Sequence, residues 1–274
     1  MTMGTITKAL TLLTHFSSGR GEIGLANFVR LSGGDKATVR RHLVELVKNG
    51  FLEQHPETRG YRLGPAVLRL ASVREKHLPV RSAIKPVVSQ MAEELGELVH
   101  ASLLQGDVMS PVFHADPLRH GLRVIFDEAE LLPLHATASG LAILAFGPDG
   151  VIDTALSGTL SSFAPNTVIT RSDMLHLVDQ FRACGYSFSD QYFTKEIVSF
   201  GMPFFGPDGD AIGTLAVPVP QARLNEELKQ RILSSLRAGC INITQSCGGQ
   251  VPEKLTAIWD TLPIATGMTP HEDA

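Results

Sequence analysis

The sequence predicts an α+β protein of two domains, a helical N-terminal domain that ends in a short hairpin and a C-terminal antiparallel sheet flanked by helices. Three observations lead to this fold class. The chain has 274 residues, enough for about two domains that each bury a core. Helical spacing of apolar residues marks the first third, and alternating segments with turns mark the rest. Charge divides similarly, since residues 1–85 carry a net charge of +8 and residues 86–274 one of −12.

This charge asymmetry predicts a basic module for a polyanion and an acidic module with another task. No segment approaches the roughly 18 uncharged apolar residues that span a bilayer, and the N-terminus lacks a signal-peptide pattern. Cys184, Cys240 and Cys247 lack CxxC spacing, which argues against a disulfide framework or a cysteine zinc site. We therefore expect a cytoplasmic protein with no membrane partner and no cofactor.

Three helices are expected near the N-terminus. Apolar residues recur at helical spacing over 6–16, and glycines follow as a stop. A second helix is predicted over 24–31, with a glycine-rich turn at 32–34. Asp35 is a good N-cap for a third helix, which runs to about Lys48 and ends at an Asn-Gly pair.

The third helix has the composition of a recognition helix. Its core-facing stripe consists of Val39, Leu43, Leu46 and Val47. Polar and basic residues lie elsewhere on its first two turns; they are Lys36, Thr38, Arg40 and Arg41. A helix-turn-helix places such a helix in the major groove, where Arg can pair with guanine and Thr or Lys suits phosphates or bases. The alternative is a solvated basic face on an ordinary surface helix.

A two-stranded hairpin directly follows this helix. Residues 51–54 and 61–63 are predicted strands, and 55–60 form the turn. Such a hairpin is the wing of a winged helix-turn-helix, and Arg59 at its tip could reach phosphate or the minor groove. We therefore predict a DNA-binding domain over residues 1–76, with double-stranded DNA as its partner.

Residues 77–96 are expected to form a linker helix that starts at Pro79. Its apolar stripe comprises Ile84, Val87, Val88, Met91 and Leu95. Palindromic DNA sites need paired winged helices, so the stripe suits a dimer seam, but it equally suits packing within the chain. The spacing alone leaves both alternatives open.

Strand and turn patterns begin at Leu98. Strands are predicted over 98–104, 108–114, 122–126, 186–193, 197–205 and 211–218, and helices over 136–146, 172–184 and 223–247. An antiparallel sheet with flanking helices over 97–248 is typical of a sensor domain. The tail, 249–274, carries one short piece around 255–259, and its last ten residues are expected to be mobile.

Several motifs together resemble the isocitrate-lyase-regulator (IclR) type of bacterial transcription factor. In the first domain they are Lys8-Ala9-Leu10, Ala37-Thr38-Val39-Arg40-Arg41-His42-Leu43, Gly50-Phe51-Leu52 and Gly60-Tyr61-Arg62-Leu63-Gly64. In the second they are Leu132-Pro133-Leu134-His135-Ala136-Thr137-Ala138-Ser139-Gly140, Pro165-Asn166-Thr167 and Cys184-Gly185-Tyr186. The likeness covers about residues 4–248.

This resemblance implies a winged helix-turn-helix, a linker helix and an effector domain similar to the small-molecule-binding GAF fold. It also implies a homodimer, often a tetramer, and a small organic acid as effector. The pocket residues implied by the resemblance are Ala136, Thr137, Ala138, Ser139, Ser189, Asp190, Ser199, Ala216 and Pro218.

The chain departs from the family pattern at several pocket positions. An acidic pair is common after Gly-Tyr, whereas this chain has Ser189-Asp190-Gln191. Glu196 replaces a common glycine, Ser199 a frequent cysteine, and Ala216 and Pro218 the usual serines. Fewer hydroxyls suit a small, fully polar acid poorly, because each oxygen buried without a hydrogen bond costs about 1–3 kcal/mol. We therefore expect a larger, partly apolar effector such as an aromatic acid.

Two other functions are considered. His114, Asp116 and His120 could suggest metal ligands, and His135 near Ser139 a nucleophile–base pair. The chain has no HExxH, Gly-x-Ser-x-Gly, P-loop or dinucleotide motif, so we expect no enzyme. An architectural DNA-binding protein without an effector would have a solidly packed second domain, whereas a sensor would have a pocket.

Overall fold

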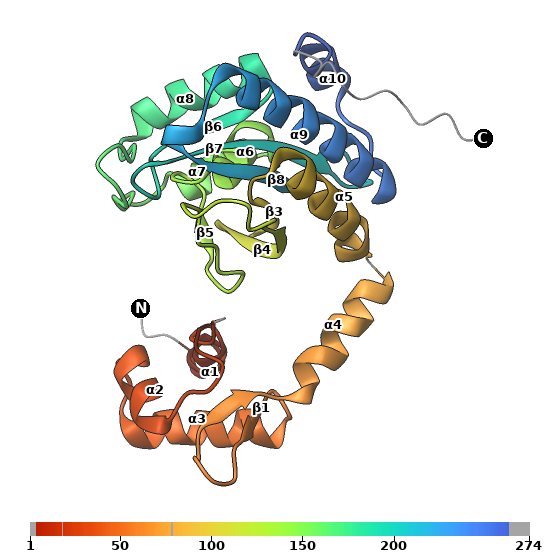
Figure 1. Ribbon diagram of the computed structural model, residues 1–274. Helices are drawn as coiled ribbons and strands as arrows, with labels where there is room; N and C mark the ends of the chain where they lie inside the picture. Colours follow the sequence, from red (N-terminus) through yellow and green to blue (C-terminus); the bar gives the residue numbers. More distant parts are fainter. Residues whose placement is uncertain (1–3, 18, 78, 263–274) are drawn as a thin grey trace, which may run out of the picture. The chain divides into compact units, whose positions relative to one another are not determined.

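The computed structural model of the chain describes residues 4–17, 19–77 and 79–262 (Figure 1). They divide into two compact units, one that runs to Pro79 and includes Asp127–Glu130, and one that comprises Val80–Phe126 and the described residues from Leu131 onward. No helix in these ranges is long and apolar enough to cross a membrane. The last ten residues, for which mobility is expected, lie outside the described part of the chain.

The first unit is a helical domain with a hairpin, as predicted. It contains α1 (Thr5–Leu13), α2 (Leu25–Ser32), α3 (Lys36–Lys48), β1 (Leu52–Gln54), β2 (Tyr61–Leu63) and α4 (Pro65–His77). Phe28 of α2 lies at the centre of its core, with ring centroids 5.8 Å from Phe16 and 6.1 Å from Tyr61. Ile23 pairs with Tyr61 through two backbone hydrogen bonds, so the segment before α2 extends the hairpin.

Local signals set the ends of α3 where the sequence predicts them. The Asp35 carboxylate accepts a hydrogen bond of 2.8 Å from the backbone N–H of Thr38 and thereby caps the helix. Gly33 ends α2 with φ of 64°, a left-handed conformation that glycine adopts without steric cost. The hairpin pairs Leu52 with Leu63, so β1 and β2 form the two antiparallel strands that the sequence predicts for a short wing.

The second unit is an antiparallel six-stranded sheet with helices on both faces (Figure 1). Its strands lie in the order β5-β4-β3-β8-β7-β6. In chain order its elements are α5 (Val80–Leu95), β3 (Val99–Gln105), β4 (Val108–Ala115), β5 (Leu132–Pro133), α6 (Ala138–Phe146), α7 (Val151–Ala155), α8 (Arg171–Cys184), β6 (Ser187–Asp190), β7 (Ile197–Phe205), β8 (Ala211–Pro220), the 3₁₀ turn η1 (Gln221–Arg223), α9 (Glu226–Ser246) and α10 (Glu253–Trp259).

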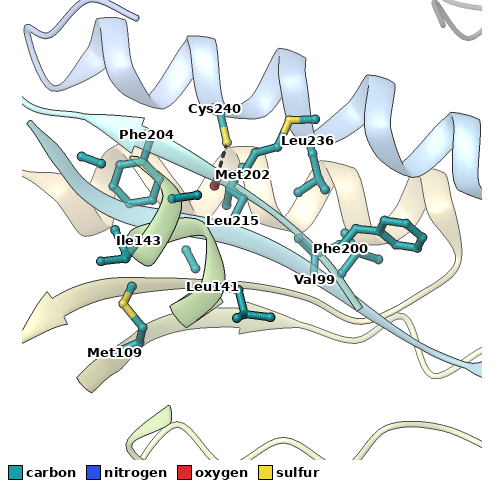
Figure 2. Packing of buried hydrophobic residues seen from close by; sticks show 14 of the residues in the cluster. Val99, Met109, Leu141, Ile143, Phe200, Met202, Phe204, Leu215, Leu236 and Cys240 are labelled. Atoms are coloured by element: carbon teal, nitrogen blue, oxygen red, sulfur yellow. Dashed lines mark hydrogen bonds between the residues drawn. The ribbon is translucent and has the colours of Figure 1, made fainter. Parts of the chain in front are cut away.

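The two faces of this sheet have different covers. Helix α6 packs on one face, which we call the α6 face, where Leu141 and Ile143 lie in Figure 2. Helices α5 and α9 pack side by side on the other, the α9 face, where the Cys240 thiol donates to the Met202 carbonyl (Figure 2). A Cβ atom on Gly239 of α9 would overlap Met91 of α5, so this glycine permits the close approach of the two helices.

The apolar stripe of the linker helix packs within the chain. Ile84, Val88, Met91 and Leu95 of α5 are all buried in the core of the second unit. Of the two alternatives, the described residues therefore show intrachain packing. A dimer seam along this stripe would first require these side chains to leave that core.

One predicted strand is wrong. Residues 122–126 form no strand, and the short edge strand beside β4 is β5. Side-chain interactions hold this segment: the Leu122 carbonyl accepts a hydrogen bond of 2.5 Å from Arg223, and the Phe126 ring lies 4.4 Å from the His100 ring. The short helix α7 is not among the elements that the sequence predicts.

Candidate functional site

The basic side of α3 is open to solvent, and its apolar side is buried. Lys36, Arg40 and Arg41 are exposed and Thr38 is half-buried. Among the described residues, no ion pair neutralises these three cations. The predicted stripe faces the core, with Val39, Leu43 and Leu46 buried and Val47 partly so. The structure therefore brings the four predicted α3 contacts together on the first two turns of one helix.

The wing presents a further cation. Arg59 is exposed at the turn, with φ of 59°, and its carbonyl accepts a hydrogen bond of 2.8 Å from Gln54. A hydrogen bond from Thr58 to Glu22 also ties the turn to the segment before α2. Arg62 differs from Arg59, because Glu53 lies opposite it and accepts at 2.5 Å. Arg59 is thus the wing cation with a side chain available for a phosphate.

The pocket residues implied by the resemblance gather mostly on the α6 face. Thr137 caps α6 by accepting from the Gly140 N–H at 3.1 Å, and its hydroxyl donates to the Pro133 carbonyl. Ser187 and Ser189 of β6 donate to the carbonyls of Ala138 and Ala136, at 2.6 and 3.1 Å. These bonds join the start of α6 to the edge of the sheet, so Ser189 positions a wall of the site.

The strand register shows which residues of β6, β7 and β8 lie on the α6 face. Ser189 pairs with Ser199, and Ser199 pairs with Pro218. Ala216, two residues before Pro218, lies on the same face because side chains alternate along a strand. The same alternation turns Asp190 to the opposite face from Ser189. Eight of the nine implied residues thus come from the start of α6 or from this face of β6, β7 and β8.

The sequence interpretation missed a polar row on the α6 face. His100 of β3 pairs with Ala216, and Ser102 pairs with Thr214. The His100 ring is buried, its Nδ1 lies 3.3 Å from the Ser102 hydroxyl, and burial lowers its pKa to about 3, with the nearby His114 adding to the effect. The sequence signal that could have revealed this row is the spacing of His100 and Ser102, two polar residues two positions apart in an otherwise apolar strand.

Two hydroxyls near this row have unused hydrogen-bonding capacity. Ser139 on the first turn of α6 and Thr214 on β8 are buried, and neither hydroxyl has a partner among the described residues. Buried polar groups nearly always have partners, so these two are candidates for contact with a bound molecule. A cavity of about 350 Å³ lies beside the edge of this region, lined by Leu98, His114 and Phe126 among others.

The residues considered for metal binding or catalysis do not assemble into such a site. Within the described ranges, no group of three His, Cys, Asp or Glu side chains could hold a metal ion. Asp116 lies 3.9 Å from Arg123, and His120 lies 3.8 Å from Glu97. His135 Nε2 lies 2.9 Å from the Ser161 carbonyl, so this nitrogen is occupied by the backbone and not by Ser139.

Comparison with known proteins matches two family models to the chain. The family model for the IclR helix-turn-helix domain matches residues 5–56, and the model for the bacterial transcriptional regulator IclR C-terminal domain matches residues 74–245. The HTH-type transcriptional regulator Rv1719 of Mycobacterium tuberculosis is 28% identical over 218 residues, which cover 80% of this chain and 83% of that protein.

Solved structures share the fold. One from Silicibacter sp. TM1040, assigned to the IclR transcriptional regulators, is 41% identical with a TM-score of 0.81, covering 92% of this chain and 99% of its own. An IclR homologue from Microbacterium hydrocarbonoxydans, complexed with 4-hydroxybenzoate, is 21% identical with a TM-score of 0.72. The match covers 93% of this chain and 100% of the homologue. The matched relatives are transcriptional regulators and not enzymes.

Because one family model spans the helix-turn-helix and the other spans most of the sheet-containing unit, this chain belongs to the IclR family of bacterial transcriptional regulators, with a C-terminal ligand-binding domain.

Proposed function

We propose that α3 and the wing bind operator DNA, and that a partly apolar organic acid bound on the α6 face changes this binding. The observation that carries the first part is the exposed basic side of α3. The first turns of a recognition helix meet base edges, and this is where Lys36, Thr38, Arg40 and Arg41 lie. Arg59 on the wing adds a phosphate contact.

The effector proposal rests on the chemistry of the α6 face. Its walls combine Ala136, Thr137, Ala138, Ser139, Ser189, Ser199, Ala216 and Pro218, with Asp190 at the edge of the sheet. The polar row of His100, Ser102 and Thr214 adds neutral hydrogen-bonding groups, and Phe126 adds an aromatic ring. An aromatic acid fits such a mixture better than an acid of two or three carbons. The 4-hydroxybenzoate in the Microbacterium homologue, which shares this fold, is a molecule of that class.

We further propose a homodimer, with a tetramer as the larger assembly, working in the cytoplasm where bacterial DNA lies. Pairing would let two copies of α3 read the two halves of a palindromic site. The ligand can change DNA affinity only if it binds two arrangements of the paired domains with unequal affinity. The 79–95 segment, which contains α5, is the proposed route of this coupling.

The test of DNA binding is a gel-mobility titration on the DNA upstream of the protein's own gene, over a range of salt concentrations. Arg41→Ala should weaken specific binding by about 1–3 kcal/mol if Arg41 reads a base. Lys48→Ala is the matched control, because Lys48 is an exposed cation in the last turn of the same helix. A uniform loss over all DNA sequences would make Arg41 a phosphate contact. Absence of any salt-dependent affinity for double-stranded DNA would refute the proposal.

The effector proposal has its own test. A thermal-shift screen would compare 4-hydroxybenzoate and other aromatic acids with glyoxylate and pyruvate, followed by calorimetry. We expect the aromatic acids to stabilise the protein. Tight binding of the two- and three-carbon acids alone would contradict the proposed effector class while leaving the DNA-binding proposal intact.

A further inference from the structure

A second cavity lies in the C-terminal unit, away from the α6 face. It has a volume of about 530 Å³ and lies among the end of α8, strands β6 and β7 and the start of α9. Phe188 of β6 alternates with Ser187 and Ser189, whose hydroxyls bond the α6 backbone, so Phe188 points to the α9 face. Phe200 of β7 pairs with Phe188 and faces the same way. The sheet therefore separates this cavity from the proposed effector site.

The floor of this cavity is aromatic. The rings of Phe188 and Phe200 lie 4.9 Å apart, and those of Tyr186 and Phe200 lie 6.2 Å apart. Phe181 and Leu224 complete the apolar lining. Small-molecule sites have volumes of roughly 300–1,000 Å³ and mostly apolar or aromatic walls with a few polar groups, and this cavity meets both criteria.

The rim of the cavity is polar but balanced in charge. Glu226 and Lys229 both line it, and their side chains form an ion pair of 3.7 Å. Tyr186 contributes a phenol, and its pKa is raised by burial and by the neighbouring Cys184 and Glu226, so it stays a neutral donor. A charged ligand would be attracted by one of Glu226 and Lys229 and repelled by the other. The lining therefore favours a neutral molecule.

The wall of the cavity is held in place by the C-terminal helix α10. The Trp259 indole N–H donates a hydrogen bond of 2.6 Å to the carbonyl of Gly185, which lies between the lining residues Cys184 and Tyr186. The Cys184 thiol also donates to the carbonyls of Phe181 and Tyr186. Helix α10 lies beyond residue 245, where the family model ends. The site is thus preformed, with a wall supported by a segment outside the family match.

We propose that this cavity is a second small-molecule site, which binds a neutral, mainly aromatic compound with one polar end. The ring enters the space over Phe188 and Phe200, and the polar end meets Tyr186 and the Glu226–Lys229 pair at the rim. The proposal does not depend on the effector site of the α6 face, because none of these residues belongs to it.

The test uses the full-length protein and benzyl alcohol as the probe. Two reporters lie beside the cavity: the Cys184 thiol lines it, and Trp259, the only tryptophan of the chain, bonds its wall. Iodoacetamide labelling of Cys184 is followed by mass spectrometry, since trypsin places Cys184 in peptide 183–195 and the other two cysteines in peptide 238–254. Benzyl alcohol should slow the labelling of Cys184 saturably, by at least about tenfold, and shift Trp259 emission over the same concentrations.

Charged analogues and variants sharpen the test. Benzoate and benzylammonium should protect Cys184 at least about tenfold less well than benzyl alcohol at equal concentration. Leu224→Phe, which fills the cavity, should abolish protection, whereas Leu175→Phe, an exposed position on α8 outside the lining, should retain it. Equal protection by all three probes, or protection that survives Leu224→Phe, would overturn the proposal. A third outcome would also overturn the proposal. Without ligand, labelling of Cys184 would slow as the protein concentration rises, and light scattering would show that the Leu224→Phe variant dissociates into subunits. A second copy of the chain would then occupy the cavity.

Discussion

The guanidinium of Arg223 donates two hydrogen bonds to the carboxylate of Glu97, with N–O distances of 2.6 and 2.7 Å. Glu97 precedes β3, and Arg223 lies in η1 between β8 and α9, so the pair joins segments 126 residues apart. The Glu97 side chain is only 5% exposed, and its hydrogen bonds raise the pKa of Arg223. Arg223 also binds the Leu122 carbonyl, which helps explain why residues 122–126 form a tethered loop and no strand.

Replacing Arg223 by methionine should destabilise the second unit by about 3–5 kcal/mol, because the buried Glu97 carboxylate loses the two hydrogen bonds and the positive charge that Arg223 supplies. Urea unfolding followed by Trp259 fluorescence measures the effect in this unit. The control is Arg119→Met, which breaks an exposed ion pair with Glu93 and should cost about 0–1 kcal/mol. Equal losses in the two variants would show that burial adds nothing to the Glu97–Arg223 pair.

Gly185→Ala should cost clearly more stability than Gly209→Ala. Both glycines have left-handed backbones, with φ of 81° and 82°, so an alanine is strained by about 1–2 kcal/mol at either position. Only at Gly185 would the new Cβ also lie 2.8 Å from Trp259 and 2.9 Å from Ile258, whereas nothing lies within 4 Å at Gly209. The same urea experiment compares them. A loss at Gly209 as large as that at Gly185 would contradict the close packing of α10.

Thr214→Val should leave the stability of the free protein unchanged or higher, because the lost hydroxyl is buried without a hydrogen-bond partner among the described residues. Thr244→Val is the matched change at a satisfied hydroxyl, which accepts at 3.0 Å from the Phe205 N–H, and it should cost about 1–3 kcal/mol. Thermal unfolding distinguishes the two. If Thr214→Val proves as destabilising as Thr244→Val, the hydroxyl already has a partner and no ligand contact follows from it.

Stability should fall as the pH decreases below about 6.5, because burial holds the His100 pKa near 3 in the folded state. The unfolded chain takes up a proton at His100 through its ordinary pKa, whereas the folded protein does not until about pH 3. Above about pH 6.5 the protonation of His100 therefore does not lower the free energy of unfolding. Below about pH 6.5 it lowers that free energy by about 1.4 kcal/mol for each pH unit.

The pH dependence can be assigned with two variants. His100→Gln should flatten the decline in urea-unfolding free energy between pH 6.5 and 4, and His176→Gln, at an exposed position of α8, should leave it unchanged. An identical decline in all three proteins would place its origin at other titrating groups.

The sequence by itself determined the helix-turn-helix and its basic side. The Asp35 cap, the glycine-rich turn before it and the spacing of Val39, Leu43 and Leu46 are signals within one helix, and they locate α3 and leave Arg40 and Arg41 outside the core. Such features depend on neighbours three or four residues apart, which a sequence shows directly.

The tertiary structure alone decided what covers each apolar face and which strands meet. Periodicity shows that α5 has an apolar stripe, but only folding shows that α9 and the sheet bury it within the chain. The register that pairs His100 with Ala216, and hence the polar row on the α6 face, joins residues more than a hundred positions apart. Pairing at that distance is set by the packing of the whole sheet, because local spacing fixes which residues share a face but not which strand lies beside them.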